Sequence, residues 1–163
     1  MSLFAWCQWL QNTALATYIN ESSWLFPFIE GSHILALPIS VGMIVIFDLR
    51  MLGLAFQDGP ASKIMKEFLR VAKFGFPIMF ITGVFLFITQ AEKAYGNAFF
   101  RAKLIFLVLL GINAVVYQII FYPKMDQWDL LGTTPAGAKV CAGLSLIVWI
   151  GVIVCGRTMA YQF

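Results

Sequence analysis

An apolar run from Trp24 to Phe56 limits the fold of this chain more than any other feature. Between Glu30 and Asp48 the run carries no formal charge when His33 is neutral. A helix from Trp24 to Asp48 rises about 36 Å, which is enough to cross a hydrocarbon core of about 30 Å. The run therefore predicts a membrane-spanning helix.

The composition extends this prediction to the whole chain. Hydrophobic residues make up 61% of the 163 residues and charged residues 12%, whereas an average soluble domain is about half apolar and a quarter charged. A soluble fold of this size could not bury so much apolar surface, so the expected solvent is the lipid bilayer. We expect one membrane domain, 1–163, forming an all-α four-helix bundle with spans at about 24–56, 67–90, 100–122 and 136–161.

The N-terminal residues 2–19 are uncharged but too polar to span a membrane. Trp6 and Trp9 are typical of the boundary between lipid and water. The segment therefore predicts one amphipathic helix over 2–19 that lies in the membrane interface.

Basic residues predict the orientation of the spans, because they are enriched on the cytoplasmic side. Four Lys and Arg residues lie on the side of the termini, and seven lie on the other side, namely Arg50, Lys63, Lys66, Arg70, Lys73, Lys124 and Lys139. This bias predicts periplasmic termini. Because the basic residues are distributed between apolar runs, they indicate topology and no nucleic-acid partner.

The first span carries polar residues on one side. At 100° per residue, Glu30, His33, Ser40 and Asp48 share a sector of about 80°. Ionisable groups inside a span are costly and usually functional. Glu30 and His33 therefore predict part of a ligand, proton or cofactor site; the alternative is an interfacial Glu30 and a single interhelical hydrogen bond from His33.

Two residues of the third span are candidate partners in such a cofactor site. Asn113 is expected near the depth of His33, and Tyr117 lies four residues further on the same helical face. Met79, on the second span, is a candidate soft metal ligand beside His33, although methionines more often serve packing. Haem b or a quinone is the cofactor considered, and a single histidine excludes bis-histidine haem ligation within one chain.

Three glycines of the first span recur at eleven-residue spacing and form the face next to the polar one. These are Gly31, Gly42 and Gly53. Small residues let a neighbouring helix approach closely, so this face predicts helix packing or oligomer formation.

Two motifs in the first span resemble a family of small uncharacterised bacterial inner-membrane proteins with four predicted helices. They are W-L-F-P-x-x-E-x-x-H over 24–33 and D-L-R-x-L-G over 48–53. The resemblance implies an inner-membrane location and no defined activity. Relatives often carry a histidine where this chain has Gln118, so the resemblance implies no chemistry that needs two histidines in this chain. Helix count and the intramembrane histidine give a looser, fold-level likeness to haem and copper membrane proteins of the b561 and copper-resistance type.

Three functions fit these observations, in order of preference. The first is a non-catalytic subunit or oligomeric scaffold of a membrane complex, suggested by the glycine face. The second is a membrane redox or ligand-binding protein that uses Glu30 and His33. The third is an oligomeric small transporter or channel lined by the polar stripe. An enzyme that acts through this chain alone is the least favoured.

Overall fold

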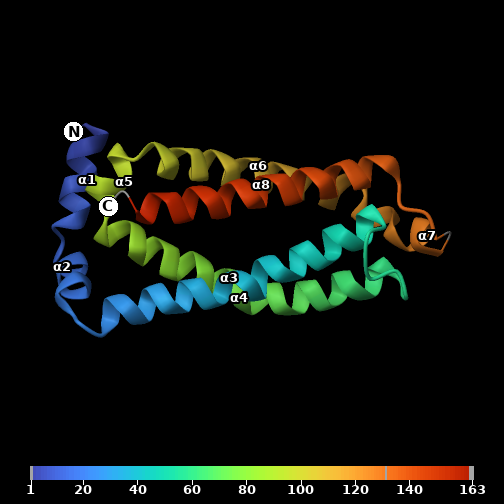
Figure 1. The fold of residues 1–163 in the computed structure, drawn as a ribbon, viewed down its shortest axis with the longest axis horizontal. Coiled ribbons are helices and arrows are strands. Elements are labelled where there is room, and N and C mark those ends of the chain that lie inside the picture. The colour runs from blue at the N-terminus through green and yellow to red at the C-terminus, as the bar shows by residue number, and fades with distance from the viewer. Residues whose placement is uncertain (1, 131, 162–163) are drawn as a thin grey trace.

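The computed structural model describes residues 2–130 and 132–161, and these contain helices and turns but no strand. Four long apolar helices run the length of the molecule, and both described ends of the chain lie at the same end of the bundle (Figure 1). The helices are α3 (Leu25–Leu52), α4 (Ala61–Thr89), α6 (Ala98–Ile120) and α8 (Ala136–Ala160). The predicted four-helix membrane bundle is confirmed, and the chain is a multi-pass membrane protein.

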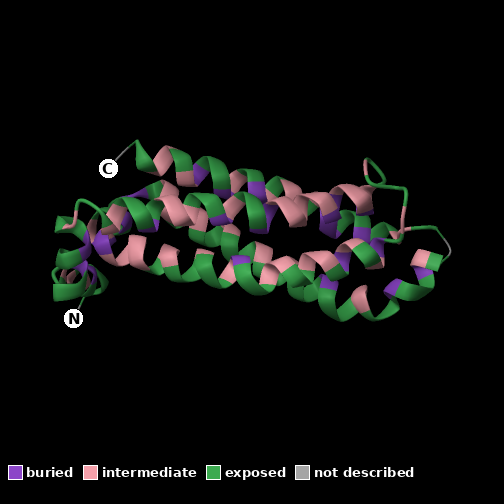
Figure 2. Cartoon of the chain, turned by 90° about the horizontal axis from the view of Figure 1, so that it is seen from below, coloured by how far each residue is buried: buried purple, intermediate pink, exposed green. Residues whose placement is uncertain are grey.

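The bundle consists of two hairpins, α3–α4 and α6–α8, that meet where α3 packs against α8. In the most apolar stretch of each long helix, 33% of α3 and 39% of α8 is buried inside the protein. The corresponding share is 11% in the span that begins with α6 and 11% in α4, so α3 and α8 are the central helices. Figure 2 shows that exposed residues occur along most of the length of the helices. The outer helices therefore present most of their surface to lipid or to another chain.

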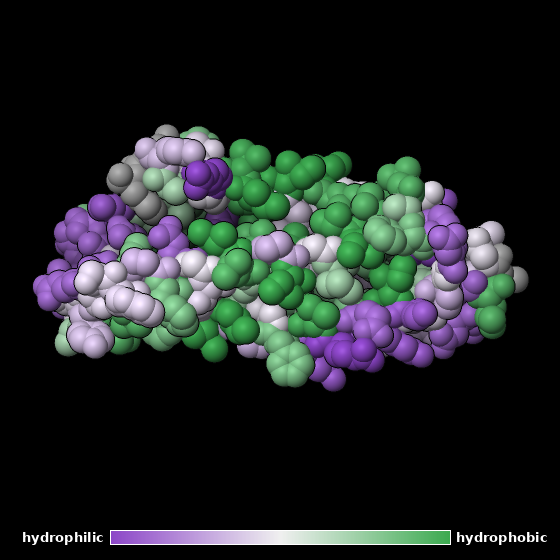
Figure 3. Space-filling view, turned by 60° about the horizontal axis from the view of Figure 1, so that its bottom comes forward, coloured by the Kyte–Doolittle hydropathy of each residue, from purple (hydrophilic) through white to green (hydrophobic). Residues whose placement is uncertain are grey.

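Hydropathy divides the molecule into three zones. Figure 3 shows an apolar band across the middle and polar surfaces toward both ends. This arrangement suits a bilayer, in which hydrocarbon covers the band and headgroups meet the polar ends. We call the end with the chain termini the terminal end, and the opposite end the loop end.

The first span ends at Leu52, four residues before the predicted boundary. Gly53 adopts a φ of 78°, in the left-handed region, and its N–H donates to the Arg50 carbonyl at 3.1 Å. Glycine takes this conformation without steric cost and commonly ends helices. Gly53 therefore caps α3 and does not belong to the flat face that it was predicted to share with the other two glycines.

The second span begins at Ala61, six residues earlier than predicted. Asp129, on the short helix α7 (Met125–Leu130), accepts hydrogen bonds from the backbone N–H groups of Ala61 at 2.8 Å and Ser62 at 3.0 Å. Burial alone would raise the pKa of Asp129, but these hydrogen bonds outweigh it and hold the pKa below its ordinary value. A charged side chain distant in sequence thus completes the first turn of α4.

The N-terminal segment forms two helices where one was predicted. These are α1 (Leu3–Gln11) and α2 (Ala14–Glu21). The chain breaks between them because Thr13 is extended and its hydroxyl oxygen accepts the N–H of Ala16 at 3.4 Å. Threonine in this position starts a new helix.

Both short helices lie across the terminal end of the bundle (Figure 1). The Gln8 amide donates to the Glu92 carboxylate of α5 (Ala91–Gly96) at 3.1 Å, and the Asn20 amide donates to the Thr89 carbonyl at 3.0 Å. Trp6 and Trp9 stay exposed. The segment therefore has the position and the side chains of an interfacial helix pair.

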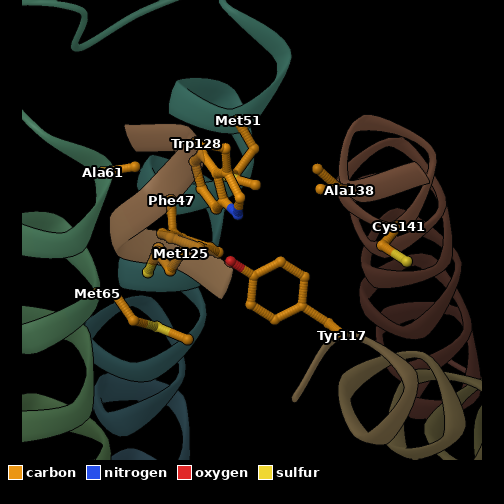
Figure 4. Close-up of a cluster of buried hydrophobic side chains, with 10 residues drawn as sticks. Phe47, Met51, Ala61, Met65, Tyr117, Met125, Trp128, Ala138 and Cys141 are labelled. Carbon is orange, nitrogen blue, oxygen red and sulfur yellow. The ribbon is translucent and has the colours of Figure 1, made fainter. Parts of the chain in front are cut away.

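The loop end contains the larger buried cluster. The 3-10 turn Tyr122–Lys124 and helix α7 fold back over it, so that all four long helices and α7 contribute side chains (Figure 4). Its buried members are Phe47, Met51, Ala61, Met65, Tyr117, Met125, Trp128, Ala138, Cys141 and Ala142.

Candidate functional site

Among the described residues, two groups of polar side chains lie inside the bundle, and the buried Ser40 of α3 lies between them. One surrounds His33, toward the terminal end, and the other surrounds Asp48, toward the loop end. Fifteen residues of α3 separate them, a rise of about 22 Å. The polar stripe predicted on this helix is therefore divided between two sites.

His33 lies at the contact between α3 and α4. Its Nδ1 is 2.9 Å from the Thr82 hydroxyl oxygen, and that hydroxyl lies 2.6 Å from the Ile78 carbonyl. A hydroxyl has one proton to donate. When Thr82 gives its proton to Ile78, its oxygen can only accept from His33. In that arrangement the neutral imidazole is the Nδ1–H tautomer, whose Nε2 keeps its lone pair.

Lys103 adds a positive charge near this histidine. It lies on α6, close enough for its charge to act on His33, and its Nζ would be 3.5 Å from a Cβ placed on Gly156 of α8. The sequence prediction used Lys103 only for topology. The signal that could have identified it is its position before an uncharged stretch that runs to Pro123.

Glu30 is not joined to His33 by a hydrogen bond. Its side chain is exposed on the outside of α3, and within the described residues it forms neither an ion pair nor a hydrogen bond. The two residues lie one helical turn apart but differ in what surrounds them, because only His33 meets a neighbouring helix.

Asn113 and Tyr117 lie away from His33. The Asn113 amide donates to the Cys141 carbonyl of α8 at 3.0 Å. The Tyr117 ring packs edge-on against Phe47, with ring centroids 5.5 Å apart, and Phe47 is about 21 Å along α3 from His33. The predicted cofactor site of these four residues is therefore not assembled, because Asn113 and Tyr117 lie with the loop-end cluster and not at the depth of His33.

Met79 serves the packing of the bundle centre. Its side chain lies against a buried cluster of Val41, Trp149 and Val152. Only its backbone is placed beside the His33 ring. In the part of the chain that the structure describes, no group of three or more His, Cys, Asp or Glu residues could hold a metal ion.

The second polar site is at the loop end. Asp48 and Tyr117 are 5% and 8% exposed, and the Asp48 Oδ2 and Tyr117 hydroxyl atoms have no hydrogen-bond partner among the described residues. The Ser145 side chain of α8 lies beside the Asp48 carboxyl group. Figure 4 shows the Tyr117 hydroxyl pointing from α6 toward Phe47 and Met125.

Unsatisfied buried polar atoms are rare and call for a water, an ion or a ligand group. The arrangement around Asp48 can therefore accept a small hydrogen-bond donor. The sequence did not predict that Asp48, Ser145 and Tyr117 lie at the same end of the bundle. Which residue of α8 lies beside Asp48 depends on how far α8 is shifted along α3, which the apolar runs do not specify.

The glycine face of α3 is open. A Cβ placed on Gly31 or Gly42 meets nothing within 4 Å among the described residues. By contrast, Gly75 and Gly83 of α4 are covered by Ser40 and His33. The predicted packing glycines of α3 are therefore unused inside the chain.

Comparison with protein families matches residues 6–162 to one family, described as a family of unknown function, DUF6644. No curated protein and no solved structure gives a significant match. The expected membership in an uncharacterised family is confirmed at this level, while the likeness to haem and copper membrane proteins stays a prediction. Because the match covers nearly the whole sequence, the chain belongs to the DUF6644 family.

Proposed function

We propose that this protein is a non-catalytic membrane subunit that assembles with a second copy of itself through the outer face of α3. The observation that carries the proposal is the open glycine face at Gly31 and Gly42. Glycine inside a helix costs about 1 kcal/mol relative to alanine. A close contact with another helix would offset this cost, and the chain itself provides no such contact at either glycine.

A second feature of α3 supports the same assembly. The exposed Glu30 side chain directly precedes Gly31 in the sequence, about 100° around an apolar helix from it. An ionisable group that faces lipid is costly and normally finds a polar partner. In a symmetric pair, each copy would contribute the glycine face of α3 and the Glu30 carboxylate to the interface. These groups would contact the same surface of the other copy.

The test compares two sets of glycine substitutions in protein reconstituted in lipid nanodiscs. Gly31→Leu with Gly42→Leu places bulk on the proposed interface, and Gly111→Leu places bulk on α6, at a glycine that is equally open. Single-molecule photobleaching then counts the copies per assembly. We expect two copies or more for the natural protein and for Gly111→Leu, and one copy for the α3 double variant.

Each other result contradicts the proposal in a different way. One copy per nanodisc for the natural protein removes the assembly itself. An assembly that persists in the α3 double variant places the interface elsewhere. Equal dissociation by Gly111→Leu shows that added bulk in the spans, and not the α3 face, is responsible.

The second candidate is a membrane redox or ligand-binding protein, and the tautomer of His33 favours it. When the Thr82 hydroxyl donates to Ile78, the neutral ring carries its proton on Nδ1, and Nε2 is the nitrogen for haem b, a quinone or another ligand. Protein purified without added haem is examined by optical spectroscopy and solvent extraction. A Soret band or a co-purified quinone that disappears in His33→Ala supports this candidate; their absence from the natural protein removes it.

A further inference from the structure

The first four turns of α4 carry an exposed basic stripe. Lys63, Lys66, Arg70 and Lys73 are all exposed. At 100° per residue they fall within a sector of about 80°, along a rise of about 15 Å. Glu67 is the one acidic residue in this part of the helix, and it pairs with Arg70 at 2.7 Å.

The charges of the stripe oppose one another. Successive basic residues are spaced three, four and three positions apart, which brings like charges close together on a helix surface and destabilises it. Glu67 relieves only one of the four. An anionic partner outside the chain would neutralise the remaining three.

The position of the stripe on α4 indicates what that partner is. Beyond Lys73 the chain has no charge until Glu92, a helical rise of about 27 Å that approaches the hydrocarbon thickness. Lys73 therefore lies at the loop-end boundary of the apolar band, and the other three basic residues extend outward through the headgroup region.

The same face of α4 continues into the membrane as an apolar surface. Phe74, Ile81 and Val84 lie in or next to the angular sector of the stripe, and they are 72%, 54% and 39% exposed. A face that is apolar where it crosses the band points toward lipid. Its basic extension therefore points toward the headgroups of the same lipids.

We infer that the basic stripe of α4 binds the headgroups of anionic phospholipids in the leaflet at the loop end. Clusters of Lys and Arg directly beside a span attract anionic lipids by charge. Because the charge is at the headgroup and the apolar surface is below it, a phospholipid satisfies both parts of the face at once. A soluble acidic protein would meet only the charges.

The experiment measures lipid selectivity at the protein surface. The protein is reconstituted in bilayers of equal parts phosphatidylcholine and phosphatidylglycerol, and electron paramagnetic resonance compares the immobilised fraction of spin-labelled forms of the two lipids. The variant Lys66→Gln with Lys73→Gln keeps the Arg70–Glu67 pair intact. The control, Lys93→Gln with Arg101→Gln, removes two exposed charges at the terminal end.

We expect the natural protein and the control to prefer phosphatidylglycerol, with a preference that weakens as salt is added. In the stripe variant, the immobilised fraction of phosphatidylglycerol relative to phosphatidylcholine should fall by at least roughly five-fold. Reversal of both charges, Lys66→Glu with Lys73→Glu, should make phosphatidylcholine the preferred lipid. Matching melting temperatures of the variants verify that the fold is retained.

Two results would overturn the inference. The first is a natural protein with no preference between the two lipids, which would leave the stripe to an acidic soluble partner. The second is a preference that both double variants lose equally, which would assign it to total charge and not to α4.

Discussion

The α3–α4 hairpin and the α6–α8 hairpin both pack side chains against glycines, but the side chains differ in kind. In the first hairpin the side chains come from α3 and are polar. Ser40, which is fully buried, lies against Gly75, and the His33 ring edge lies against Gly83. The helices approach closely at these points because glycine has no side chain to separate them.

In the second hairpin the packed side chains come from α6 and its C-terminal cap, and two of them are aromatic rings. The Phe106 ring would be 2.9 Å from a Cβ on Gly151, and the Phe121 ring 2.6 Å from a Cβ on Gly137. Rings fill more space than a hydroxymethyl group and can tilt when a neighbour grows. This hairpin should therefore tolerate added atoms better than the first.

The strongest test of the comparison is Gly75→Ala. The new methyl group would overlap the Ser40 hydroxyl, which is fully buried, and would also approach the Ser40 Cβ to 3.3 Å. We expect a loss of about 1–3 kcal/mol in unfolding free energy, as for other overpacked sites, measured by denaturation in mixed micelles. Gly111→Ala, at an open position, supplies the baseline for helix propensity.

A second substitution verifies the cause of that loss. Ser40→Gly together with Gly75→Ala removes the overlapping hydroxyl and should restore part of the stability. Equal stability of Gly75→Ala and Gly111→Ala would show that α3 and α4 are not in close contact at this point.

An intermediate effect is expected for Gly151→Ala. The methyl group meets the edge of the Phe106 ring, which can rotate away, so the loss in unfolding free energy should be about 1 kcal/mol or less. Phe106→Leu in the same chain should recover it. A loss as large as that of Gly75→Ala would remove the distinction between polar and aromatic packing.

The smallest effect is expected for Thr82→Val, which removes the hydroxyl that His33 contacts but retains the shape. Interhelical hydrogen bonds in membranes contribute about 0.6 kcal/mol on average, and the same denaturation assay should show a loss of that size. Thr158→Val is the control, because the Thr158 hydroxyl donates at 2.9 Å to the Val154 carbonyl of its own helix. Equal losses in the two variants would mean that His33 gains nothing from Thr82.

The sequence predicted the four spans well, because uncharged stretches of sufficient length have few alternatives in a membrane protein. It also predicted, as one of two interpretations, that His33 forms a hydrogen bond with a neighbouring helix. Both results depend on local physical properties: the length of an apolar run, and the cost of an ionisable group in lipid.

The contacts between elements were not predictable in the same way. The shift of α8 along α3 sets which residues meet Asp48, and the turn after Phe121 decides that α7 folds back over the bundle. Neither quantity leaves a periodic pattern in the sequence. For this reason Asn113 and Tyr117 were assigned to the site of His33, and the role of Asp129 was missed.

The capping of α4 by Asp129 bears on the order in which the protein can be completed. The chain is made from its N-terminus, and Asp129 comes 68 residues after Ala61. The first turn of α4 therefore waits, with unsatisfied N–H groups, until α6 has crossed the membrane and delivered α7 to the same side. An α6 inserted in the wrong direction would leave the carboxylate on the opposite side of the bilayer, so the cap forms only in a correctly threaded chain.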